Sequence, residues 1–201
     1  ADVVICDYNY VFDPRVALKR FFTQSEEGDG YCFLIDEAHN LVDRAREMYS
    51  AQLDKERILA VRRLVKDRLP DIAKALNAVN KVLLDYRKRG EEEDLTDWVG
   101  EEPPTEMRDS LTYFTDTGSA WLNESDDTDI PDLVDLFFDA MMFVTIMELF
   151  DTRFSTLYRR AGQGMDVRIF CTDPSHVLEI CLQKAWAAVF FSATLVPLDY
   201  H

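Results

Sequence analysis

Two short polar clusters follow apolar runs, and their residue types suit nucleotide chemistry. The first is D-E-A-H-N at residues 36–40, directly after the apolar run 31–35. In open α/β sheets ligands bind at the carboxyl ends of strands, where Asp36 could hold Mg²⁺ through water. The adjacent Glu37 could orient or deprotonate an attacking water. Taken alone, the two acids could equally cap the helix that follows.

The second cluster is Ser192-Ala193-Thr194, which follows the apolar run 187–191. By itself it could be a strand end with a capping serine. If both apolar runs are strands of one parallel sheet, the two clusters share one edge. His39 should then lie within direct or water-bridged hydrogen-bond reach of Ser192 or Thr194. The alternative is that each cluster caps its own helix and the two never meet.

The elements that position these clusters are expected to form an α/β fold with a large all-α insertion. Short apolar runs without alternation favour buried parallel strands. The stretch 41–165 has helical spacing of its apolar residues, with a break at Pro70. We therefore predict one domain from residues 1–40 and 166–201, and a helical domain from residues 41–165. The four predicted strands lie near residues 3–6, 31–35, 167–171 and 187–191.

Composition excludes several protein classes. Hydrophobic residues make up 47% of the 201 residues, which is too many for a disordered chain. The longest nearly apolar run, 136–150, is interrupted by two acids and is too short for a membrane span. No signal peptide opens the chain, and it begins at Ala1 without Met, so we expect a piece of a longer protein. The cysteines form no C-x-x-C pair, which predicts buried free thiols in a reducing, cytoplasmic setting; they are Cys6, Cys32, Cys171 and Cys181.

The charge is unevenly distributed. The net charge is −16. Residues 44–89 hold 13 Lys/Arg against 6 Asp/Glu, whereas residues 91–139 hold 1 against 17. The two segments could be solvated helix faces that attract each other, or the basic one could follow the phosphates of single-stranded DNA, with Tyr86 and Trp98 stacking on bases. The candidate DNA-binding residues are Arg62, Arg63, Lys66, Arg68, Arg87, Lys88 and Arg89.

Together, D-E-A-H and S-A-T resemble two signature motifs of superfamily 2 helicases. Residues 1–14, 34–41 and 192–199 further resemble segments of the XPD/DinG-like DNA helicases. The resemblance implies a partial RecA-like motor domain with a helical arch inserted between the two motifs. It also implies an enzyme that uses ATP and Mg²⁺ to move along single-stranded DNA and unwind duplexes, with DNA repair as the expected purpose.

The resemblance also implies roles for individual residues. Asp36 would hold Mg²⁺ and Glu37 would activate water. His39 with Ser192, Ala193 and Thr194 would couple hydrolysis to strand movement.

The sequence departs from the family in two respects. It contains no G-x-x-x-x-G-K-[ST] phosphate loop, so we expect this chain to be inactive by itself. The family's [4Fe–4S] cluster is held by four cysteines upstream of the segment resembled by residues 1–14, and none of the cysteines here matches them. The alternative function is a helical protein-interaction module that docks a partner through its acidic face, on a non-catalytic motor remnant.

Overall fold

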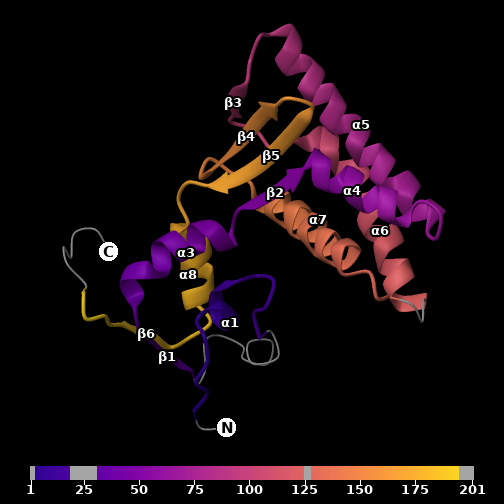
Figure 1. The fold of residues 1–201 in the computed structure, drawn as a ribbon. Helices are drawn as coiled ribbons and strands as arrows, with labels where there is room; N and C mark the ends of the chain where they lie inside the picture. The colour runs from indigo at the N-terminus through magenta and orange to yellow at the C-terminus, as the bar shows by residue number, and fades with distance from the viewer. Residues whose placement is uncertain (1–2, 19–30, 125–127, 195–201) are drawn as a thin grey trace. The chain divides into compact units, whose positions relative to one another are not determined.

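The structure, a computed structural model, describes residues 3–18, 31–124 and 128–194. The chain divides into two compact units (Figure 1). Unit 1 comprises Ala1–Tyr49 and Cys171–His201, and unit 2 comprises Ser50–Phe170. Each unit has its own secondary structure and its own buried residues.

Unit 1 is built on a pair of parallel strands. Strand β1 (Cys32–Ile35) pairs with β6 (Ala187–Phe190), so that Ile35 lies opposite Phe190. The two eight-residue helices of this unit each bury one face, because their buried residues recur every three to four positions. The helices of unit 1 are α1 (Asn9–Phe12), η2 (Ala38–Asn40), α3 (Leu41–Met48) and α8 (Ser175–Leu182).

Unit 2 contains an antiparallel sheet with strand order β2-β5-β4-β3. Inward and outward residues alternate along its strands: Phe154, Thr156 and Tyr158 of β4 are buried, while their neighbours are partly exposed. A tight turn joins β4 to β5 at Gly162, whose φ of 56° lies in the left-handed region that glycine adopts without strain. The strands are β2 (Ala51–Asp54), β3 (Asp97–Gly100), β4 (Phe154–Ala161) and β5 (Gly164–Cys171).

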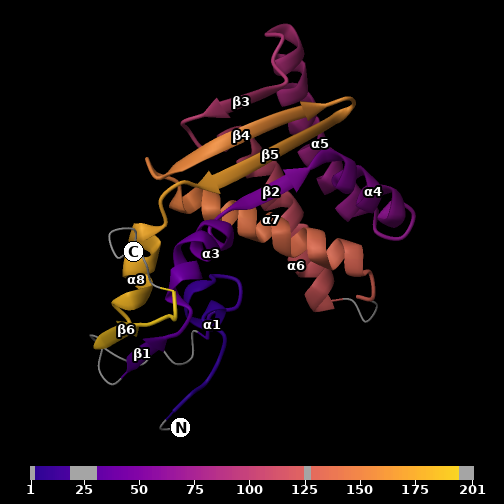
Figure 2. The same ribbon diagram turned by 60° about the vertical axis from the view of Figure 1, so that its left-hand side comes forward.

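The helices of unit 2 gather on one face of this sheet (Figure 2). The side chain of Asp54 caps the first of them by accepting a hydrogen bond from the Arg57 amide at 2.7 Å. Pro70 begins the next helix, as its fixed φ and missing N–H favour. The helices are α4 (Lys55–Val65), α5 (Pro70–Glu92), η3 (Thr105–Met107), α6 (Arg108–Glu124) and α7 (Pro131–Leu149).

Two of the four predicted parallel strands are wrong. Residues 3–6 form no strand, and Ile5 is 95% exposed. Residues 167–171 are a strand, but it belongs to β5 and pairs antiparallel with β2. The region predicted as the insertion, residues 41–165, is therefore not all-α, because it contains β2, β3 and β4 of a four-stranded sheet. A short apolar β-branched run favours extended backbone, yet it does not specify which partner strand it joins.

Helix α5 continues past Gly90 to Glu92, and a Cβ on Gly90 would lie 2.8 Å from the Trp98 ring, so glycine here permits close packing.

The cysteine prediction fails for two of the four residues. Cys6 and Cys32 are exposed free thiols, whereas Cys171 and Cys181 are buried as predicted.

No helix in the described ranges has the length and apolar character needed to cross a membrane.

Candidate functional site

The two polar clusters meet at the carboxyl ends of β1 and β6. Pairing continues beyond the strands, because Phe191 N donates to Ile35 O at 3.0 Å and Ala38 N donates to Phe191 O at 3.2 Å. The second of these bonds ties the backbone of one cluster directly to the strand that leads into the other. The segments 36–40 and 192–194 consequently lie side by side, although about 150 residues separate them.

His39 joins the two clusters through its side chain. Its Nδ1 lies 2.7 Å from Ser192 Oγ and 3.3 Å from Thr194 Oγ1. The predicted hydrogen-bond contact is therefore confirmed. The same nitrogen lies 3.2 Å from Glu37 Oε2. The Nδ1 atom of a neutral imidazole donates in one tautomer and accepts in the other. A hydroxyl can also donate or accept, so the hydrogen bond between His39 and Ser192 can form with either tautomer of the ring.

Glu37 has a backbone conformation that is uncommon outside glycine. Its φ of 52° and ψ of 37° place it in the left-handed region. Asp36 Oδ1 accepts a hydrogen bond from Glu37 N at 2.8 Å and supports this turn. The turn leaves both carboxylates exposed at the strand end. Residues with such strained backbone persist only where the surrounding structure holds them in place, and they cluster at functional sites.

The donor set at this turn fits Mg²⁺. That ion takes one or two carboxylates and keeps waters or phosphate oxygens as its other ligands. Asp36 supplies such a carboxylate beside Glu37. Among the described residues, no group of three or more His, Cys, Asp or Glu side chains gathers into a metal cage. A single carboxylate from Asp36 would leave the other positions around such an ion to water and phosphate oxygens.

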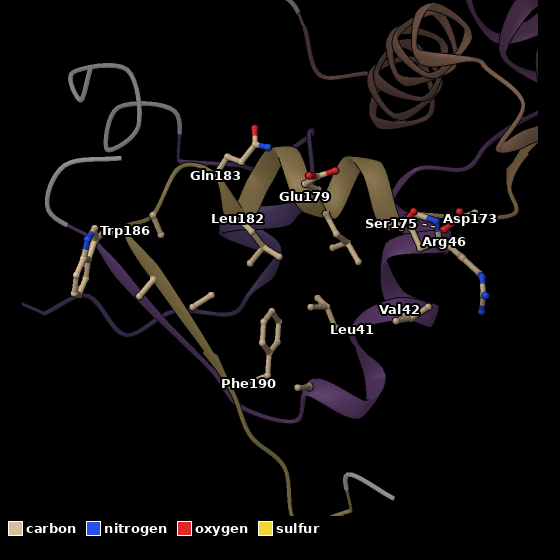
Figure 3. A pocket seen from close by; sticks show the side chains of 16 residues that line it. Leu41, Val42, Arg46, Asp173, Ser175, Glu179, Leu182, Gln183, Trp186 and Phe190 are labelled. Atoms are coloured by element: carbon tan, nitrogen blue, oxygen red, sulfur yellow. Dashed lines mark hydrogen bonds between the residues drawn. The ribbon is translucent and has the colours of Figure 1, made fainter. Parts of the chain in front are cut away.

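A pocket of about 790 Å³ lies beside these clusters within unit 1 (Figure 3). Leu41 of α3, Leu182 of α8 and Phe190 of β6 point into it from three sides. Its lining includes Ala38 but none of the acids or the histidine of residues 36–39. The pocket is thus a mainly apolar hollow whose lining excludes the Asp36 and Glu37 carboxylates.

The seven candidate DNA-binding residues do not form one surface. Arg62, Arg63, Lys66 and Arg68 lie at the end of α4 and in the loop before α5. The other three lie at the far end of α5, about 26 Å away along the axis at 1.5 Å per residue. Each of these three pairs with an acid: Arg87 with Glu91 at 2.6 Å, Lys88 with Glu92 at 3.9 Å and Arg89 with Glu106 at 3.5 Å.

The aromatic residues expected to stack on bases are engaged elsewhere. Tyr86 is 1% exposed and its hydroxyl donates to Glu106 Oε2 at 2.8 Å, so it cannot meet a base. Burial, followed by the neighbouring Tyr158 and Glu106, raises the pKa of Tyr86. Trp98 stacks on Tyr158 with ring centroids 5.0 Å apart, which occupies one of its faces.

One titratable pair was not predicted from the sequence. Asp54 and Asp166 lie directly opposite each other on β2 and β5. Burial first, and then the hydrogen bond and charge of Asp54, raise the pKa of Asp166 to about 6. Only the register of the sheet brings the two carboxyls together, so the sequence contained no local signal for them.

Two comparisons with known proteins give a match, each over less than a third of the chain. Residues 1–58 match the DEAD_2 family model. A segment of 62 residues is 36% identical to the Fanconi anemia group J protein homolog of Gallus gallus. That segment is 31% of this chain and 5% of the relative, so the chain spans a small part of that relative's length. The family match contains residues 36–40 and ends before most of unit 2.

Proposed function

Because residues 1–58 match the DEAD_2 family and contain D-E-A-H after β1, the chain is similar to XPD/DinG-like helicases, and we propose that it is part of an ATP-dependent DNA helicase. Unit 1 would be part of the first RecA-like motor domain, and unit 2 would be the arch inserted between its two motifs. ATP hydrolysis would drive movement along single-stranded DNA and unwinding during repair.

The residues at the strand ends have distinct proposed roles. Glu37 accepts a proton from the water that attacks the terminal phosphate. Asp36 would hold a Mg²⁺, which would supply positive charge to neutralise phosphate oxygens. His39, together with the segment Ser192-Ala193-Thr194, transmits the state of the nucleotide to β6. The phosphate loop and a [4Fe–4S] cluster would be supplied by residues outside this chain.

The exposed apolar surface of unit 1 supports this proposal. Leu34 is 70% exposed and Val189 is 49% exposed, although they occupy neighbouring parallel strands. Parallel sheets in known folds are covered on both faces. We infer that other parts of the same motor domain cover these side chains. The exposed free thiols Cys6 and Cys32 favour a reducing compartment inside the cell.

The contact of His39 with Ser192 and Thr194 is the observation on which the coupling depends. In the full-length protein, changing Ser192→Ala together with Thr194→Ala should leave ATP hydrolysis within a few-fold of normal. It should abolish strand displacement, because the change at residues 36–39 no longer reaches β6. ATPase and unwinding rates measured on the same preparation test this.

A matched control is Thr145→Ala, since the Thr145 hydroxyl donates only within its own helix, to Met141 O at 3.0 Å. This variant should hydrolyse and unwind normally. A Ser192/Thr194 double variant that unwinds at the normal rate would contradict the coupling role.

A further inference from the structure

Helix α7 has an apolar stripe on its exposed side. Phe138 is 56% exposed, Met141 43% and Leu149 40%, while Val134 is half-buried. Their spacing of three to four residues, continued by exposed Thr145, places them on one face of the helix. Contiguous exposed apolar groups of this kind mark interaction surfaces more often than isolated ones do.

The opposite face of α7 is fully engaged in the core of unit 2. Leu133, Phe143 and Ile146 are completely buried. A helix that is apolar all round is normally covered on every side. The exposed stripe is therefore a surface whose partner lies outside the described part of unit 2.

The stripe is held rigidly by this core. The Phe138 ring packs edge-on against Phe137, with centroids 5.3 Å apart. Phe137 is 4% exposed and lies so close to Gly118 that a Cβ there would be 2.6 Å from its ring. An aromatic side chain fixed in this way loses little conformational entropy when a partner covers it.

The charge beside the stripe restricts what could cover it. Helix α7 contains four acids and no Lys or Arg. Asp135 and Glu148 are exposed on the two flanks of the stripe, and Asp139 pairs with Arg57 of α4. Nucleic acid and anionic lipid would be repelled by this surface, and a second copy of α7 would bring like charges together.

We propose that this stripe, defined by Val134, Phe138, Met141 and Leu149, is the docking site for an amphipathic helix with basic flanks from a partner protein. The apolar anchors of that helix would be spaced i, i+3 or i+4, and i+7, as in other helix recognition. Its Lys or Arg residues would face Asp135 and Glu148. This proposal does not depend on the helicase function of unit 1.

Selection from a displayed peptide library tests it. The library would fix an apolar stripe on a helical peptide and randomise the flanking positions among Lys, Arg, Glu, Gln and Ser. Panned against the 201-residue chain, it should enrich Lys and Arg at the flanks. The Phe138→Ala variant should bind the selected peptides at least about tenfold more weakly, because a central aromatic anchor is removed.

Two further variants make the result specific. Leu84→Ala, on α5, removes a side chain that is 40% exposed elsewhere in unit 2 and should leave binding unchanged. Asp135→Lys with Glu148→Lys should reverse the flank preference to Glu. Thermal unfolding of each variant confirms that it is folded.

Three results would overturn the proposal. One is the absence of charge preference at the flanks of the selected peptides. Another is selection that Phe138→Ala does not weaken. The third is concentration-dependent dimerisation of the unliganded chain that Phe138→Ala abolishes, which would identify a second copy as the occupant.

Discussion

The two units differ in their motifs and in the size of their cores. Unit 1 holds D-E-A-H and S-A-T on a sheet of two strands, and leaves Leu34, Val189 and Phe190 exposed. Unit 2 holds a four-stranded sheet with its helices and a large buried core, but the surfaces proposed for binding contain no short motif. Recognisable chemistry and a complete core are thus found in different parts of one chain.

This difference shows what each kind of evidence can identify. A reaction site needs a few residues of fixed type at strand ends, so its sequence can be recognised even where the surrounding sheet is small. A docking or scaffold unit needs only apolar residues at suitable spacing, which many sequences satisfy. The motif therefore indicates where in unit 1 the proposed chemistry would take place, and only the structure shows the surface of unit 2.

The largest expected effect tests whether unit 1 is the hydrolytic part. In the full-length protein, Glu37→Gln should lower ATP hydrolysis by about 10²- to 10⁴-fold, the range that removal of a general base costs, while ATP still binds. Steady-state ATPase and nucleotide-binding measurements check this. Glu47→Gln, a matched change at an exposed residue of α3, should have no effect. Normal hydrolysis by Glu37→Gln would place the chemistry elsewhere.

The next effect compares the two cores. Phe143→Ala, at a fully buried position of unit 2, should lower the free energy of unfolding by about 3–5 kcal/mol. Phe190→Ala, at a position 43% exposed in unit 1, should cost less than about 1 kcal/mol in this chain because much of its ring is already in water. Urea unfolding followed by Trp fluorescence measures both.

The same Phe190→Ala change sharpens the comparison in the full-length protein. If the rest of a motor domain covers β6, the substitution should cost clearly more there than in the 201-residue chain. Equal costs in both would contradict the proposal that this sheet is covered.

A smaller effect concerns DNA binding by unit 2. Replacing Arg62, Arg63 and Lys66 with Ala in the full-length protein should weaken single-strand binding and reduce the salt slope, by about 0.7 for each phosphate that is no longer neutralised. Binding titrations at several salt concentrations measure it. The matched triple change at residues 87–89 should alter the slope less, since those cations already pair with acids. Equal slopes for wild type and the first triple variant would exclude a DNA role for α4.

The smallest effect is a pH dependence within unit 2. The pKa of Asp166 is about 6 in the folded chain against 3.8 as an ordinary value, so folding favours its protonated form. Stability should fall as pH rises through 6 and be greater at pH 5 than at pH 7.5. Asp166→Asn should raise the melting temperature at pH 7.5 by a few degrees and have little effect at pH 5.

Thermal unfolding of the 201-residue chain at both pH values checks the Asp166 prediction. Asp85→Asn, on an exposed position of α5, serves as the control and should change neither melting temperature. An Asp166→Asn variant with the same pH dependence as wild type would show that the Asp54–Asp166 pair is not its source.

The sequence predicted one contact of the candidate site better than it predicted the fold. The contact of His39 with Ser192 follows from two polar clusters at the ends of neighbouring parallel strands, and short motifs fix such positions. The β4–β5 hairpin was missed, because β4 has no long apolar run and one of its buried positions is the polar Thr156, so hydrophobicity does not mark the inward face. The run at 167–171 favoured a strand, but its pairing depends on residues far away in the chain.

Strands β2 and β5 have a consequence for how this protein could have arisen. Ala51 and Ile169 lie opposite each other, so the chain enters and leaves unit 2 through neighbouring strands, about 5 Å apart. A segment whose ends nearly touch can be inserted into a surface turn of a host gene, or removed from it, without stretching the host backbone. Strands β2 and β5 thus give unit 2 the geometry of a transferable module, which could acquire binding partners independently of unit 1.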